Sequence, residues 1–211
     1  MNRRTRSVGR RRPVRRPAAR IVVATEGAST EPAYLRALNR LFADESVRLE
    51  LVSGVGDPRA VVEQAIEELA KSKRDPLGND DSVWAMFDRD AHDRFAEAKD
   101  LARGNGIGLA VSDPCFELWG IFHYRDQQAP LDRHECQRML EELCPGYERK
   151  GRKLFGDMQV IEQHYADAVR RARQSLDNRS AEGNPEGNPS TTVYRLTEGL
   201  RRAVDRAKEE L

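Results

Sequence analysis

The sequence predicts an α/β domain built around a mostly parallel, four-stranded sheet, with further helices toward the carboxyl end. In the first half of the chain, short apolar segments alternate with segments of helical period, and the connections between them are short. The apolar segments "IVVA" and "VWAMF" have no polar interruptions. Parallel strands read this way when helices cover both faces of the sheet. We therefore expect three layers, in the order helix, sheet, helix.

Four strands and three helices make up this expected core. The strands are rich in β-branched and apolar residues, and we place them at 20–25, 47–52, 83–87 and 107–112. The intervening segments carry apolar residues three and four positions apart, which predicts helices at 31–42, near 61–69 and near 95–101.

Helices are expected to dominate the chain after the fourth strand. Asp113 and Pro114 have the residue types of a helix cap and a first helical position. Asp132 and Glu135 have the spacing of a capping box. Beyond them we expect a long helix with apolar positions from Met158 to Leu176, a mobile Gly-, Pro- and Asn-rich loop at 178–190, and a last helix that starts at a Ser or Thr cap.

The charge distribution divides the chain into a basic arm and an acidic body. Of its 211 residues, the first 20 contain nine arginines and no acid, and the others carry 27 Lys and Arg against 35 Asp and Glu. We expect a disordered Arg-rich arm at 1–19 and one domain at 20–211, with an α/β core (20–125) and a helical extension (126–211). The arm either binds phosphates through residues such as Arg10, Arg11 and Arg12, or is a solubilising tail.

The lack of a recognisable targeting signal and the spacing of the cysteines favour a cytoplasmic protein. The arm lacks the apolar segment of a secretory signal, and no apolar run of about 18 residues points to a membrane. Cys115, Cys136 and Cys144 show neither C-x-x-C nor zinc-finger spacing, so we interpret them as core thiols in a reducing compartment.

Acidic residues follow two of the expected strands. Glu26 follows the first strand, and Asp88 and Asp90 follow the third. If these strands are neighbours, the three carboxylates converge outside the carboxyl ends of the sheet, where α/β proteins bind ligands. Such oxygen ligands suit Mg²⁺ or Mn²⁺. The alternative is ordinary: the aspartates end a strand and cap the next helix, and Glu26 is a solvated loop acid.

Further candidate residues lie beyond these acids. Glu117 is an acid in the apolar segment "CFELWGIF" and is either a ligand for a second metal ion or the partner of a structural group such as an arginine. His92 either assists proton transfer or is a surface histidine. Lys150 and Lys153 belong to a basic loop cluster that either faces phosphate or is merely solvated.

Four sequence blocks, in order, carry a resemblance to a known family. The blocks "TEGASTEPAYL", "VWAMFDRDAH", "SDPCFELWGIFHY" and "NPSTTVYRL" resemble the RloB-like family, and "VVATEG" with "FDRD" resembles the Toprim domain of primases, topoisomerases and nucleases. The resemblance implies that Glu26 is a general acid or base, or an outer metal ligand, and that Asp88 and Asp90 hold Mg²⁺. Asp113 stands where the family commonly has Asn.

The predicted function is therefore that of a Mg²⁺-dependent, Toprim-type nuclease. The resemblance implies action on DNA or RNA phosphodiesters in bacterial anti-phage defence, through abortive infection. No Walker A motif is present, so an ATP-driven step requires a partner ATPase encoded nearby. The alternative is a non-catalytic regulatory or binding module that partners such an ATPase. A homo-oligomer is compatible with either hypothesis.

Overall fold

A five-stranded sheet lies at the centre of the protein. The computed structural model describes residues 19–42, 47–72, 81–89, 94–151 and 155–209. The strands are β1 (Ala19–Thr25), β2 (Val47–Ser53), β3 (Ser82–Asp88), β4 (Gly108–Asp113) and β5 (Ser190–Thr191), in the spatial order β2-β1-β3-β4-β5. The first four strands are parallel, and the short β5 runs antiparallel to β4. The sequence predicted the four parallel strands but missed β5.

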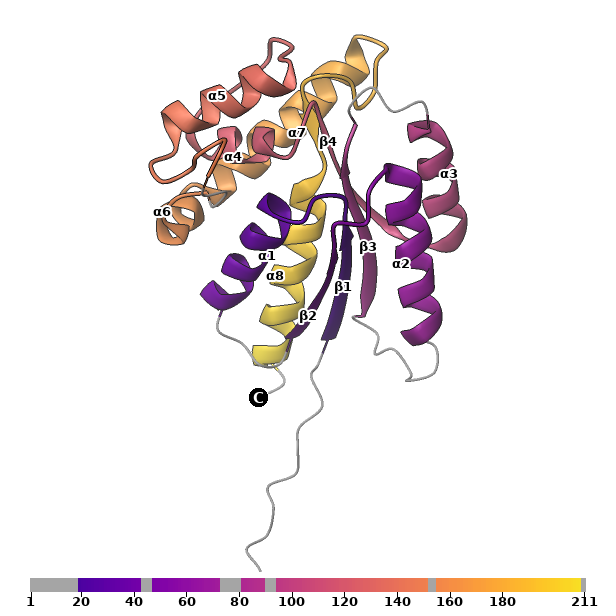
Figure 1. Ribbon diagram of the computed structural model, residues 1–211. Helices are drawn as coiled ribbons and strands as arrows, with labels where there is room; N and C mark the ends of the chain where they lie inside the picture. Colours follow the sequence, from indigo (N-terminus) through magenta and orange to yellow (C-terminus); the bar gives the residue numbers. More distant parts are fainter. Residues whose placement is uncertain (1–18, 43–46, 73–80, 90–93, 152–154, 210–211) are drawn as a thin grey trace, which may run out of the picture.

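Helices cover both faces of the sheet, which confirms the predicted α/β class and its layers. On one face lie α1 (Thr30–Phe42) and α8 (Val193–Glu209), and on the other lie α2 (Pro58–Ser72) and α3 (Phe95–Asn105), as Figure 1 shows. Successive side chains of a strand point to opposite faces. Both faces are buried at the central strands β1 and β3, and this is why "IVVA" and "VWAMF" are continuously apolar.

The strand β1 illustrates how one sheet serves two cores. Ile21 and Val23 pack into the larger apolar cluster, together with side chains of α1 and α8. Val22 and Ala24 pack into the smaller cluster, with side chains of α2 and α3. All four side chains are at most 1% exposed.

The remaining helices gather beyond the end of the sheet at which the parallel strands finish (Figure 1). They are α4 (Glu117–Tyr124), α5 (Arg133–Leu143), α6 (Met158–Gln163) and α7 (Tyr165–Ala181). The predicted capping box is present: the Glu135 amide donates to the Asp132 carboxylate, and the Asp132 amide donates to the Glu135 carboxylate. The single long helix expected after residue 158 is instead two helices that meet at His164.

Two other local expectations differ from the structure. Asp113 is the last residue of β4 and forms an ion pair with Arg89 (3.5 Å), while α4 begins only at Glu117, so Asp113 does not cap that helix. The loop expected at 178–190 is shorter, because α7 continues to Ala181. Asn188 ties this loop to Leu131, whose backbone carbonyl accepts from the Asn188 side chain (2.7 Å) and whose amide donates to it (3.0 Å).

Two further predictions concern the cysteines and membrane-spanning segments. All three cysteines are buried and unpaired, as expected for core thiols. Within the described ranges, no helix has the length and apolar character needed to cross a membrane.

Candidate functional site

The carboxyl ends of β1 and β3 bring two predicted acids together. The two strands are hydrogen-bonded neighbours, with Thr25 opposite Met86. Directly after β1, the Glu26 amide donates to the Met86 carbonyl (3.0 Å), and the Glu26 carboxylate accepts from the Asp88 amide (3.1 Å). Glu26 and Asp88 therefore lie side by side at the carboxyl ends of the strands, where ligands bind in α/β folds.

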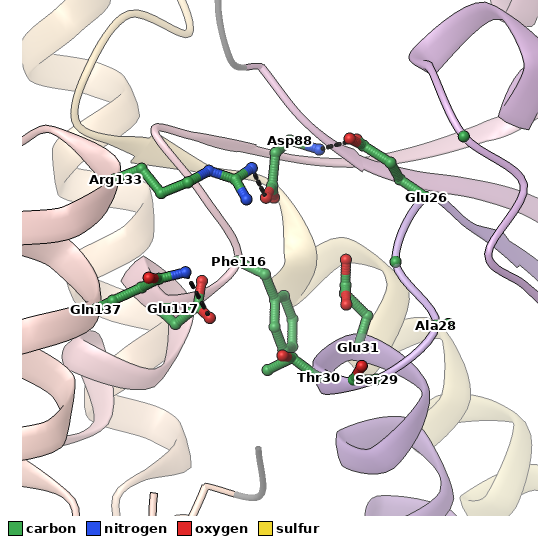
Figure 2. A pocket seen from close by; sticks show the side chains of 12 residues that line it. Glu26, Ala28, Ser29, Thr30, Glu31, Asp88, Phe116, Glu117, Arg133 and Gln137 are labelled. Carbon is green, nitrogen blue, oxygen red and sulfur yellow. Dashed lines mark hydrogen bonds and ion pairs between the residues drawn. The ribbon is translucent and has the colours of Figure 1, made fainter. Parts of the chain in front are cut away.

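A pocket of about 390 Å³ opens at the carboxyl ends of these strands. Loop residues after β1, the end of β3, the start of α4 and the first turns of α1 and α5 line it. Figure 2 shows the carboxylates of Glu31, Asp88 and Glu117 around a common space, with Glu26 above it. Arg133 is the only basic residue among the described residues that line the pocket. The pocket is therefore strongly acidic.

Asp88 links the end of β3 to α5. Its carboxylate accepts from the Arg133 guanidinium at 2.7 Å, with side-chain exposures of 10% for Asp88 and 38% for Arg133. Burial raises the pKa of Asp88 well above its usual value, and repulsion from Glu31 raises it further. The positive charge of Arg133 lowers the pKa of Asp88. Smaller repulsions from Glu117 and Glu26 raise it.

Glu31 is a fourth acid of the pocket. It lies in the first turn of α1, and the residue is only 8% exposed. Burial raises its pKa first of all, and the charges of Glu117 and Glu26 raise it further, while hydrogen bonds from backbone amides lower it. A β-carbon at Gly27 would lie 2.6 Å from a carboxylate oxygen of Glu31, so the absence of a side chain at Gly27 makes room for this acid.

Glu117 opens α4 and is 4% exposed. The Tyr147 hydroxyl donates to its carboxylate at 2.7 Å, and the Gln137 amide donates to the same oxygen at 3.5 Å. These partners are neutral, whereas the structural alternative considered from the sequence was an arginine. Neither of these two hydrogen-bond donors to Glu117 is a cation.

The acids of the pocket are of the right chemical type to bind a divalent cation, but their side chains are not arranged around one. Four carboxylates face one guanidinium, and the pKa values of Asp88 and Glu31 are raised first by burial and then by the neighbouring acids. Hard carboxylate oxygens are the ligands that Mg²⁺ and Mn²⁺ prefer. Within the described ranges, however, no three His, Cys, Asp or Glu side chains lie close enough together to hold a metal ion. Groups of the protein already bind Asp88, Glu26 and Glu117.

The other predicted site residues either lie outside the described residues or do not line the pocket. Asp90, His92, Arg10, Arg11, Arg12 and Lys153 lie outside the described residues. Lys150 is exposed in the loop between α5 and α6 and does not line the pocket. Arg89, between the two aspartates in sequence, bonds the Glu186 carbonyl (2.5 Å) and stacks on Phe95 (5.2 Å), so the cation beside Asp88 is Arg133 instead.

Sequence reasoning missed Glu31, Arg133 and Tyr147. Glu31 was missed because an acid in the first turn of a helix is common, since it interacts favourably with the helix dipole. Arg133 follows the Asp132 cap, so its place at the start of α5 was predictable, but its partner 45 positions earlier was not. Tyr147 lies in a loop with no periodic pattern, and nothing in the sequence connects it to Glu117.

Comparison with known proteins gives one match. The profile of a family described as RloB-like protein matches residues 21–200, which is most of the chain. No curated protein and no solved structure matches significantly. The matched range includes every described acid of the pocket, the sheet from residue 21 onward, and the helices α1, α4 and α5 that carry pocket residues. The chain therefore belongs to the RloB-like family.

Proposed function

We propose that the protein is a metal-dependent nuclease that hydrolyses nucleic-acid phosphodiesters at the acidic pocket. The observation that supports this most strongly is the meeting of Glu26, Asp88, Glu31 and Glu117 in one pocket at the carboxyl end of the sheet. Acids gathered in this way serve phosphoryl chemistry by holding Mg²⁺ or Mn²⁺. When bound, such an ion would supply positive charge to a phosphodiester and lower the pKa of water.

The chain's own residues have distinct roles in this proposal. Asp88 is the principal ligand because it is central and buried, and Asp90 assists as the family resemblance implies. Glu26 accepts or returns the proton of the attacking water, or binds the ion through a water molecule. Glu117 and Glu31 complete the negative charge of the pocket and favour a divalent cation over a monovalent one.

The biological setting is proposed from the resemblance to RloB-like and Toprim sequences. It suggests an antiviral defence protein of bacteria, working with a neighbouring ATPase and using DNA or RNA as substrate. The arginines of residues 1–20 would add salt-dependent affinity for phosphates.

The test of the proposed activity uses Asp88→Ala in the full-length protein. We expect purified parent protein to cleave members of a panel of DNA, tRNA and ribosomal RNA at fixed Mg²⁺, with and without the neighbouring ATPase, and the variant to lose at least about a hundredfold in rate. Asp205→Ala, an exposed acid on α8, is the control and should keep parental activity. Equal cleavage by Asp88→Ala and parent would disprove the site.

A non-catalytic module is the second candidate, and one observation favours it. All four acids already have hydrogen-bond partners within the protein, as a scaffold without a metal would require. Thermal melting with and without Mg²⁺ separates the two functions, since a ligand that binds only the folded state raises the melting temperature. The nuclease proposal expects a rise that is lost in Asp88→Ala, whereas a scaffold is indifferent to Mg²⁺.

A further inference from the structure

Arg133 occupies the place in the pocket where a cation is needed. It is the first residue of α5, and its guanidinium reaches from that helix to Asp88 at the end of β3, as Figure 2 shows. The distance from its nitrogen to the Asp88 carboxylate is 2.7 Å. The capping box of Asp132 and Glu135 holds the start of α5, so the position of Arg133 is supported independently of Asp88.

The ion pair between Arg133 and Asp88 has the properties of a replaceable contact. The Arg133 side chain is 38% exposed, and an ion pair with one solvated member is weak because water screens it. The Asp88 side chain is 10% exposed, and its neighbours are acids, so a carboxylate here needs a cation of some kind. A divalent ion at Asp88 would meet twice the attraction that a guanidinium meets at the same distance.

A displaced Arg133 would remain at the mouth of the same pocket, because the start of α5 stays in place. Guanidinium groups bind phosphate oxygens through paired N–H donors in a planar fork. A phosphodiester that enters this pocket must approach four carboxylates, and among the described lining residues only Arg133 offers a positive charge to it.

We propose that Arg133 neutralises Asp88 until a divalent cation takes its place, and that the released guanidinium then binds a phosphate oxygen of the nucleic acid. The inference rests on the proposed function and specifies how the site changes from its empty to its loaded form. It also accounts for the geometry of the pocket, in which the acids surround a common space while their carboxylates are engaged by groups of the protein.

The first measurement concerns the metal alone. Isothermal titration with Mn²⁺ would compare the parent protein with Arg133→Gln, Arg133→Lys and Arg138→Gln, the last being an exposed arginine of the same helix that does not line the pocket. We expect Arg133→Gln to bind Mn²⁺ about threefold more tightly or better, because a competing charge is gone. The other two variants keep their charge at position 133 and should match the parent.

The second measurement concerns the phosphate. Fluorescence anisotropy in Ca²⁺ would follow binding of a mixed-sequence single strand of about 20 nucleotides, long enough for a usual single-strand site, as DNA and as RNA. We expect Arg133→Gln to lose about tenfold in affinity, the usual effect of a lost charge-assisted hydrogen bond. Arg133→Lys should lose less, and Arg138→Gln should remain near the parent.

The outcomes separate this inference from the proposed function. Mn²⁺ affinity that is unchanged or weaker in Arg133→Gln would overturn the exchange, whether or not the parent cleaves nucleic acid. Tighter Mn²⁺ binding together with weaker oligonucleotide binding supports it, even if no substrate of the panel is cleaved. Should Arg133→Gln fail to fold, Arg133→Lys decides, because it must keep parental Mn²⁺ affinity and lose part of its oligonucleotide affinity.

Discussion

Glu31 places a carboxylate where burial and like charge both oppose ionisation. Its pKa is raised, mainly by burial and then by Glu117 and Glu26, and the pKa of Asp88 is raised in the same sense. The folded protein therefore holds protons at a pH at which the unfolded chain has already lost them. The contribution of these two groups to the free energy of unfolding is highest at low pH. It decreases as pH rises from their unfolded pKa through their folded pKa.

Replacing Glu31 by Gln should stabilise the metal-free protein at pH 8. Glutamine keeps the shape and an oxygen that accepts from the backbone amides but removes the charge, so repulsion of Asp88 and Glu117 decreases. We expect the free energy of unfolding to rise by about 1 kcal/mol, the usual size of a single-substitution effect. The gain should shrink as pH is lowered from 8 toward 5, because the raised pKa means that parental Glu31 takes up its proton sooner than an ordinary glutamate does as pH falls. Urea denaturation at both pH values measures it.

The control for this prediction is Asp205→Asn, which removes an exposed charge from α8 that does not line the pocket. We expect it to change stability by less than about 0.5 kcal/mol at either pH. A loss of stability in Glu31→Gln at pH 8, or a pH dependence equal to that of the parent, would contradict the assignment of Glu31 as a repelled buried carboxylate.

At the scale of elements, the turn from β1 into α1 determines where two of the acids lie. Glu26 directly follows β1, and Glu31 lies in the first turn of α1. Gly27 lies between them, and a β-carbon there would meet the Glu31 carboxylate at 2.6 and 2.8 Å. The obstacle is the end of a flexible side chain, so the helix itself can stay in place while Glu31 moves.

Gly27→Ala should therefore impair the site more than the fold. We expect a loss of stability below about 1 kcal/mol, since only a side-chain tip must shift, but a several-fold weaker affinity for Mn²⁺, because Glu31 is pushed from its place beside Asp88. Titration calorimetry and urea denaturation measure the two effects. Gly104→Ala in α3, whose β-carbon would meet nothing within 4 Å, is the matched control and should keep parental Mn²⁺ affinity.

Parental Mn²⁺ affinity in Gly27→Ala would show that Glu31 takes no part in binding the cation.

The same turn shows the limit of sequence reasoning at this scale. The residues "EGASTEP" predict a loop that opens a helix, and α1 starts within one residue of the expected position. They do not reveal that Gly27 and Glu31 come into contact, because that contact depends on the direction in which the turn returns to the sheet.

At the scale of the whole molecule, α8 joins the end of the chain to its beginning. Leu196, Leu200 and Val204 of this helix are at most 3% exposed and belong to the same apolar cluster as Ile21 and Val23 of β1. The helix covers the face of the sheet that α1 covers only in part (Figure 1). Its removal would expose apolar surface of the central strands, so the fold depends on contacts between the two ends of the chain.

Leu200→Ala should destabilise the protein by about 2–5 kcal/mol, the range seen when a buried leucine leaves a cavity. The unfolding transition should remain single, because α8 shares one core with the sheet. Leu101→Ala on α3, where the leucine is only partly buried, should cost about 1 kcal/mol. Thermal and urea unfolding measure both, and a separate early transition in Leu200→Ala would contradict the shared core.

The core elements of the fold were predictable because each is set by a local pattern. Apolar runs such as "VWAMF" predicted β3, and the spacing of Tyr34, Leu35 and Leu38 predicted α1, whose buried residues they are. The capping box of Asp132 and Glu135 was predictable for the same reason. The short β5 was not, since two residues, Ser190 and Thr191, carry no strand pattern and become a strand only by pairing with Ser112 and Asp113.

The sequence by itself determined the α/β class, the ends of the parallel strands, and the placement of Glu26 and Asp88 after two of them, because these follow from periodicity and from the common direction of parallel strands. Only the tertiary structure decided that β1 and β3 are neighbours, that Glu31 and Glu117 join the same pocket, and that Arg133 is the cation beside Asp88. Those are contacts between residues distant along the chain, and they depend on how the helices pack over the end of the sheet.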